Sequence, residues 1–177
     1  ALVCREEIIR IMLQALREKK VAAKDSEISE IFAEVHKQFI NDISDYTSLL
    51  PGVKNVLEAL RAASVKMALV TSDSIVNTCR ILEDLSIEEY FDAVIGKEAT
   101  KEPKVSGIPA VEALRALKLE PEDTVCIGDA PMDALMSVNS GLRAAICVAT
   151  GQTGYRELEK YTPYLLDSLQ ELKIEMK

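Results

Sequence analysis

The stretch "TVCIGDAPMDALMSVNSG", residues 124–141, decides how this chain folds. A short, mostly apolar run ends at Asp129, and a second acid, Asp133, follows four residues later. Such a run predicts a buried strand, while Pro131 near the start and Gly141 at the end of the next segment predict a helix. In open α/β sheets, the residues just after a strand line the ligand site. The stretch therefore predicts a strand–helix unit that carries two carboxylates at a candidate site.

Apolar runs and amphipathic segments alternate around this unit. Strands are expected within residues 65–70, 91–96, 124–129 and 143–149. Helices are expected within residues 53–63, 74–85, 108–119 and 131–141. The tail, residues 162–176, is expected to give a short apolar stretch and then a last helix. Alternation of this kind predicts an α/β fold in which helices cover both faces of a mainly parallel sheet. We therefore expect a Rossmann-like, three-layer α/β/α core over residues 51–177.

The first fifty residues have a different pattern. Two segments, residues 5–20 and 26–40, each place their apolar residues on one helical stripe. Pro51-Gly52 then interrupts the chain before the alternating pattern begins. We expect residues 5–50 to form a small, all-helical unit in front of the core.

Composition narrows the class of protein. Of 177 residues, 48% are hydrophobic and 28% charged, and the net charge is −8. The acidic balance argues against nucleic acid or an anionic membrane as partners, and no apolar run is long enough to cross a bilayer. The four cysteines are far apart, without zinc-site spacing, which favours reduced thiols and a cytoplasmic protein. The one histidine, His36, lies in a helix-like stretch, where packing is the expected role.

The two acids suggest a magnesium site. Close carboxylates repel each other unless a cation lies between them. Mg²⁺ suits Asp129 and Asp133, because proteins usually hold this ion through one or two carboxylates, waters and a phosphate. In the alternative interpretation, Asp129 only caps the helix that begins near Pro131. The pair alone leaves both interpretations open.

Two further features follow other strand-like runs. Thr71-Ser72 comes after residues 65–70, where hydroxyl and backbone N–H groups can bind a phosphate oxygen or cap the next helix. Lys104 lies in the loop after residues 91–96, where its charge could neutralise a phosphate and a nearby carboxylate. On its own, Lys104 is one of 21 basic residues.

In combination, these features resemble the haloacid dehalogenase-like hydrolase superfamily. Residues 49–74, "LLPGVKNVLEALRAASVKMALVTSDS", resemble its second motif region, with Thr71 in the hydroxyl position. Residues 104–142 resemble its third and fourth motifs, with Lys104 as the lysine and Asp129 and Asp133 as the acidic pair. The ending "TGQTGYRELEKYTPYLLDSLQEL" is similar to that of the phosphoglycolate phosphatase-like branch. The helical unit of residues 5–50 would then be the family's cap domain.

The sequence departs from this family at two motifs. The third motif usually reads Lys-Pro, but Val105 follows Lys104 here, so Lys101 is a second candidate for the phosphate lysine. The first motif, a strand ending in D-x-D-x-T, is not found in the chain. In the family this strand lies mid-sheet, and without it two strand edges would face each other across an apolar gap. We therefore expect a segment of roughly ten residues, one strand and a turn, upstream of Ala1.

The resemblance implies a magnesium-dependent phosphatase for a small, soluble phosphate ester. The family reacts through an aspartyl-phosphate intermediate, and the nucleophilic Asp is expected upstream of Ala1. Thr71 and Lys104 would serve catalysis, Ser72 and Asp73 would join them in binding substrate, and Asp129 and Asp133 would hold Mg²⁺. Arg5 is a weaker candidate for substrate contact. The alternatives are an inactive binding or scaffold protein and a phosphomutase of the same superfamily; a monomer or homodimer is expected.

Overall fold

The computed structural model describes the chain in several stretches: residues 14, 16, 18–19, 24–31, 33–34, 47–151 and 153–175. The chain divides into two compact units, Ala1–Thr47 and Ser48–Lys177. In the first unit, residues 25–31 and 33–34 are helical, and the Lys24 backbone N–H donates to Glu27 Oε2 at 2.9 Å where this helix begins. Much of the predicted helical cap, with Cys4, Arg5 and His36, lies outside the described residues.

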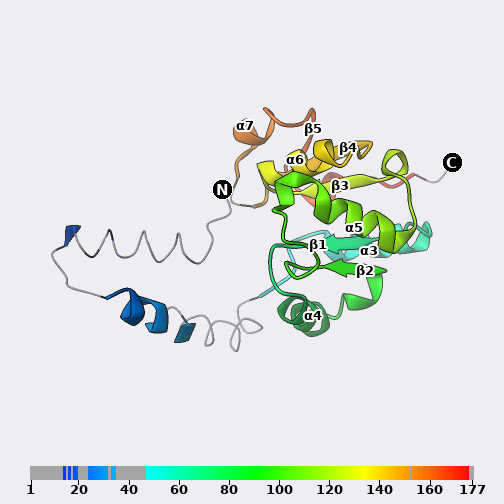
Figure 1. Cartoon of the computed structure of the whole chain (residues 1–177). Coiled ribbons are helices and arrows are strands. Elements are labelled where there is room, and N and C mark those ends of the chain that lie inside the picture. The colour runs from blue at the N-terminus through cyan, green and yellow to red at the C-terminus, as the bar shows by residue number, and fades with distance from the viewer. Residues whose placement is uncertain are drawn as a thin grey trace. The chain divides into compact units, whose positions relative to one another are not determined.

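The second unit alternates strands and helices (Figure 1). Its strands are β1 (Ala68–Val70), β2 (Ala93–Ile95), β3 (Val125–Gly128), β4 (Ala144–Val148) and β5 (Tyr164–Leu166). Its helices are α3 (Val53–Ala62), α4 (Ile75–Asp84), α5 (Ile108–Leu117), α6 (Pro131–Asn139) and α7 (Tyr155–Leu158). Short 3₁₀ turns are η1 (Glu88–Tyr90), η2 (Lys104–Ser106), η3 (Pro121–Asp123) and η4 (Leu169–Glu171). The predicted α/β fold is confirmed.

The strands form two parallel sheets. β1 pairs with β2, with Leu69 opposite Val94, while β3 pairs with β4 and β4 with β5. Consequently β1 and β3 each have one edge without a strand partner among the described residues. We call β1–β2 and β3–β4–β5 the two halves of the core.

Local signals start and stop the helices as the sequence suggests. Ser74 Oγ accepts a hydrogen bond from the Asn77 N–H at 3.2 Å and caps α4. Gly141, with a φ of 71°, closes α6 in the left-handed conformation that glycine adopts without steric cost. These residues fix the ends of the helices that flank the candidate site.

Each half of the core has its own apolar cluster. Around β1 and β2 the buried members are Leu57, Met67, Leu82, Ile87 and Tyr90. Beside β4 they are Ala134, Ala145, Cys147 and Leu158. No helix among the described residues is long and apolar enough to cross a membrane.

The predicted last helix is wrong over the described part of the tail. The short apolar stretch expected before it, residues 164–166, forms β5 and extends the parallel sheet beside β4. Only the single 3₁₀ turn η4 follows, and Leu172 after it is extended, with φ −71° and ψ 117°. The short helix α7 has too few residues for a periodic pattern and was not expected.

Candidate active site

Asp133 is built into the junction between β3 and α6. Its Oδ2 accepts hydrogen bonds from the backbone N–H groups of Asp129 (3.2 Å) and Ala130 (3.1 Å), which are otherwise unpaired at the start of α6. Its side chain packs so closely on Gly128 that a Cβ there would overlap the carboxylate. Glycine at the end of β3 is thus what admits a buried acid beneath the first turn of α6.

Lys104 reaches Asp133 from the turn η2, which packs on α6. Its Nζ lies 2.6 Å from Asp133 Oδ1, and the two side chains are only 17% and 7% exposed. The turn that carries Lys104 is fixed to the end of α6, because Asn139 Nδ2 donates to the Val105 carbonyl at 2.7 Å. Gly107, with a φ of 83°, packs against the Asn139 backbone at a place where a Cβ would stand 2.7 Å from its carbonyl carbon. Lys101, the alternative lysine, is exposed.

Asp129 differs from Asp133 in its surroundings. It is exposed, and its backbone N–H donates to Asp133. Among the described residues none donates a hydrogen bond to its carboxylate. The Asp129 side chain is therefore the acid that is available to a ligand.

Thr71 ends β1 in a tight, hydrogen-bonded turn. Its backbone N–H extends the ladder to Ile95 O at 2.9 Å, and its Oγ1 accepts a hydrogen bond from the Asp73 N–H at 3.1 Å. Since the hydroxyl oxygen already accepts this bond, its hydrogen is left to donate to a ligand. Asp73 turns back on α4: Oδ1 accepts from the Ser74 N–H at 2.7 Å, and Oδ2 accepts from Asn77 Nδ2.

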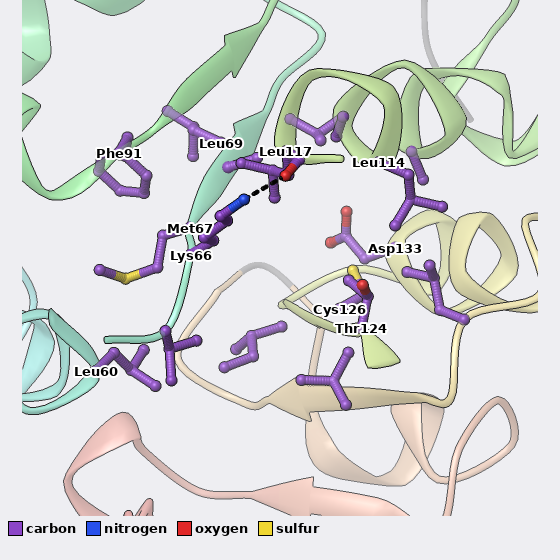
Figure 2. Close-up of a pocket in the computed structure, with 18 of the residues that line it drawn as sticks. Leu60, Lys66, Met67, Leu69, Phe91, Leu114, Leu117, Thr124, Cys126 and Asp133 are labelled. Atoms are coloured by element: carbon purple, nitrogen blue, oxygen red, sulfur yellow. Dashed lines mark hydrogen bonds between the residues drawn. The ribbon is translucent and has the colours of Figure 1, made fainter. Parts of the chain in front are cut away.

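A groove of about 390 Å³ separates β1 from β3 (Figure 2). Its labelled apolar walls include Leu60, Met67, Leu69, Leu114 and Leu117, and Thr124 and Cys126 line it from the β3 side. Val125 and Ile127 are 45% and 38% exposed, although both are aliphatic residues of a strand. The groove is thus bordered by two strand edges without a strand partner among the described residues, and it exposes apolar surface.

Polar groups gather at the groove as well. Val70, the residue before Thr71, lines the same groove as Lys104 and Asp133. At another point of the wall, Lys66 Nζ donates to the Leu117 carbonyl at 2.7 Å, as the dashed line in Figure 2 shows. The groove thus links the end of β1 with the ion pair at the end of β3.

The thiols beside the site are not nucleophiles. Burial raises the pKa of Cys126 to about 12, and the negative charge of Asp133 adds to this effect while Lys104 opposes it. Burial, with the charges of Asp133 and Asp129, also raises the pKa of Cys147. Both thiols stay protonated at neutral pH, and only a thiolate attacks efficiently.

The residues present fit a Mg²⁺ ion. The Asp129 carboxylate is exposed, and Asp133 Oδ1 already receives a positive charge from Lys104 at 2.6 Å. Each carboxylate oxygen has more than one lone pair, so Asp133 retains acceptor capacity. In the described part of the chain, neither this site nor any other gathers three or more His, Cys, Asp or Glu side chains that could hold a metal ion. Two carboxylates suffice for Mg²⁺ when waters and a phosphate complete its shell.

The structure therefore brings Lys104 and Asp133 together, with Asp129 beside them, and puts Thr71 at the end of β1. Ser72 is exposed in the same turn. The sequence interpretation missed Gly128, Asn77 and Asn139, which hold these residues in place. A glycine directly before the strand-end acid was a signal for Gly128, and the four-residue spacing from Asp73 was one for Asn77.

This fold and this constellation belong to a family of hydrolases. Residues 4–147 match the haloacid dehalogenase-like hydrolase family. The chain belongs to that family, as the motifs predicted.

Related proteins agree with this class. The chain is 30% identical over 152 residues to the phosphoglycolate phosphatase of Aquifex aeolicus, covering 85% of this chain and 68% of that protein. It spans only 46–56% of several other phosphoglycolate phosphatases that it matches. These relatives place the chain among phosphoric monoester hydrolases.

Solved structures show the same fold. A predicted phosphoglycolate phosphatase from Haemophilus somnus superposes with a TM-score of 0.79 at 19% identity, over 88% of this chain and 69% of that one. CbbY from Rhodobacter sphaeroides, solved in complex with phosphate, gives 0.72 at 22% identity, over 95% and 80%. At these identities the likeness concerns the fold alone.

Proposed function

We propose that the chain is the larger part of a magnesium-dependent phosphatase that acts on a small phosphate ester. The observation that carries the proposal is the meeting of Lys104 and Asp133 at the end of β3, 2.6 Å apart, beside the exposed Asp129. A buried cation and a carboxylate at the carboxyl end of a parallel strand form a site where charge can be neutralised. Phosphoryl transfer depends mainly on such neutralisation and on positioning.

Each candidate residue has a role that its contacts support. Asp129 would bind Mg²⁺ directly, and Asp133 directly or through water. The Thr71 hydroxyl, whose oxygen already accepts the Asp73 N–H, would donate to a phosphoryl oxygen. Lys104 would lie between Asp133 and the phosphate and neutralise both. When bound, Mg²⁺ would lower the cost of bringing a carboxylate and a phosphate together.

The reaction would occur in two steps. A carboxylate oxygen of an aspartate forms a bond to phosphorus while the bond from phosphorus to the leaving alcohol breaks, and the alcohol oxygen takes a proton. Water then attacks the phosphorus of the aspartyl phosphate, which releases inorganic phosphate and restores the carboxylate. Among the described residues the site offers no second buried acid for this attack, since Asp133 caps α6.

We assign the attacking carboxylate to an aspartate on a strand that precedes Ala1 in the whole protein. The groove between β1 and β3 supports this assignment, because it has two open strand edges and apolar walls. A strand placed there would pair on both sides and cover Val125 and Ile127. Its carboxyl end would emerge beside Lys104 and Asp133.

The remaining features of the proposed function follow from the sequence. The substrate would be a small phosphorylated metabolite, and residues 5–50, which the sequence predicts to be a helical cap, would select the leaving group. The net charge of −8 supports neither nucleic acid nor an anionic membrane as a partner. We propose a cytoplasmic enzyme that is a monomer or a homodimer.

Phosphate release by the protein with its upstream segment tests the proposal. With p-nitrophenyl phosphate as the substrate, removing Mg²⁺ with a chelator or replacing Asp129 with Asn should lower kcat by about a hundredfold or more. Lys104→Met should have a similar effect, because the phosphate loses its neutralising charge. Lys101→Met is the matched control and should retain activity.

Two results would overturn the proposal. Equal phosphate release by the Asp129→Asn and parent proteins would remove the metal assignment. Activity that survives Lys104→Met but is lost in Lys101→Met would assign the phosphate lysine to the exposed loop residue instead.

A further inference from the structure

The loop after β4 lies directly against the side chain of Asp129. A Cβ on Gly151 would overlap Asp129 Oδ2 and Cγ and would stand 2.6 Å from Asp129 Cβ. Gly151 is not in the left-handed region of φ, so its backbone conformation does not call for glycine. The close packing requires glycine at position 151, because no side chain fits between this loop and Asp129.

Another glycine of the same loop has no such constraint. A Cβ on Gly154 would meet nothing within 4 Å, and its φ of −75° suits any residue. The close approach is therefore a property of Gly151 and not of the whole loop.

Both ends of this loop are held in place. Where it leaves β4, the Ala149 N–H donates to the Leu166 carbonyl of β5 at 2.9 Å. Where it enters α7, Leu158 is fully buried and packs in a cluster with Ala134 and Cys147. The residues on both sides of Gly151 are therefore anchored in the fold.

We propose that Gly151 is a positioning residue for Asp129. Rotation of the Asp129 side chain would relieve the overlap of a Cβ with Oδ2 and Cγ, but not the 2.6 Å separation from Cβ. Any larger residue at position 151 must therefore move both the carboxylate and its attachment to the chain. Since hydrogen bonds from the described residues do not hold this carboxylate, the steric contact sets where it meets a divalent cation. The inference rests on the proposed function, in which Asp129 is a metal ligand.

Manganese binding tests the inference without any need for catalysis. Mn²⁺ is titrated into the parent protein and its Gly151→Ala, Gly154→Ala and Asp129→Asn variants, and affinity is read from the relaxation of water protons. Gly151→Ala should weaken Mn²⁺ binding about tenfold, the effect of disturbing a residue that orients a metal ligand. Gly154→Ala should change it by less than about twofold, as expected of a surface substitution.

A thermal unfolding series without metal separates positioning from a general loss of structure. Gly151→Ala should lower the unfolding midpoint of the parent protein, but not that of an Asp129→Gly protein, in which the three nearest atoms are gone. If Gly151→Ala binds Mn²⁺ like the parent while Asp129→Asn does not, the inference is wrong and the metal site stands. If Asp129→Asn binds Mn²⁺ like the parent, the metal site itself is wrong, and the inference with it.

Discussion

The two halves of the core hold their candidate site residues in different ways. In the β3–β4–β5 half, Asp133 is fixed by contacts that also build the fold: it caps α6, packs on Gly128 and pairs with Lys104, 29 positions earlier in the chain. In the β1–β2 half, Thr71 Oγ1 and the Asp73 carboxylate bond only within residues 71–77. The segment after β2 also holds this turn, because Glu98 Oε2 accepts from the Ile75 N–H at 3.0 Å and the Lys97 N–H donates to the Asp73 carbonyl at 2.9 Å. The candidate acid is thus part of the framework in one half, while in the other the side chains of Thr71 and Asp73 are held mainly by bonds within their own turn.

Removing the Asp133 carboxylate should have the largest effect, and it tests whether this side chain is part of the framework of the β3–β4–β5 half. Asp133→Ala leaves Lys104 half-buried without its partner and two N–H groups of α6 without their acceptor. Breaking a buried ion pair from one side typically costs about 3–5 kcal/mol. We expect the free energy of unfolding, measured by urea denaturation, to fall by that amount.

Asp129→Asn is the matched control for this measurement. Asp129 lies four residues away, is exposed and has no hydrogen bond to its carboxylate from the described residues, so its replacement should change stability by less than about 0.5 kcal/mol. Equal stabilities of the Asp133→Ala and Asp129→Asn proteins would show that Asp133 is not part of the structural framework.

The contrast also explains what the sequence could predict. Strand ends, helix starts and the order Thr71, Lys104, Asp129 and Asp133 are local signals, since they depend on apolar periodicity and turn residues along the chain. The ion pair was foreseeable only from the rule that ligand sites lie at the carboxyl ends of parallel strands. Their positions after strands made these residues candidates, and the resemblance to the hydrolase family singled them out as one site.

Other features depend on contacts between distant segments. Gly151 and Asp129 are 22 positions apart, and the parallel pairing of β3 with β4 brings the segments after the two strands together. A last helix was predicted after the apolar stretch of the tail, but that stretch pairs with β4 as β5 and only the 3₁₀ turn η4 follows it. Tertiary pairing outweighs local propensity in such short segments.

A smaller effect is expected in the β1–β2 half from Asn77→Ala. Asn77 is 4% exposed, donates from Nδ2 to Asp73, and has a buried Oδ1 without a hydrogen-bond partner. Losing a bond to a charged acceptor costs about 1.5 kcal/mol, while the unsatisfied Oδ1 is removed at the same time. We expect a loss of about 1 kcal/mol in unfolding free energy.

The local turn should respond more than the fold does. Hydrogen exchange at the Asp73 N–H, which donates to Thr71 Oγ1, should become faster in Asn77→Ala, whereas exchange in β3 should not change. Ser72→Ala, an exposed position in the same turn, serves as the control and should leave both rates unchanged. Faster exchange throughout β3 would mean that the turn and the β3–β4–β5 half are coupled after all.

The smallest expected effect concerns Cys126, which faces the groove between the halves. Burial raises its pKa from 9.0 to about 12 in the folded protein, so the unfolded thiol ionises first as the pH rises. Its contribution to stability is complete below pH 9 and is lost as the pH rises from 9 toward 12. Between pH 7.5 and 9.5 the unfolding free energy of the parent protein should therefore fall by about 1 kcal/mol more than that of a Cys126→Ser protein, whose side chain does not titrate. Parallel stability curves for the two proteins over this range, measured by urea denaturation, would mean that the β3 edge of the groove does not bury this thiol.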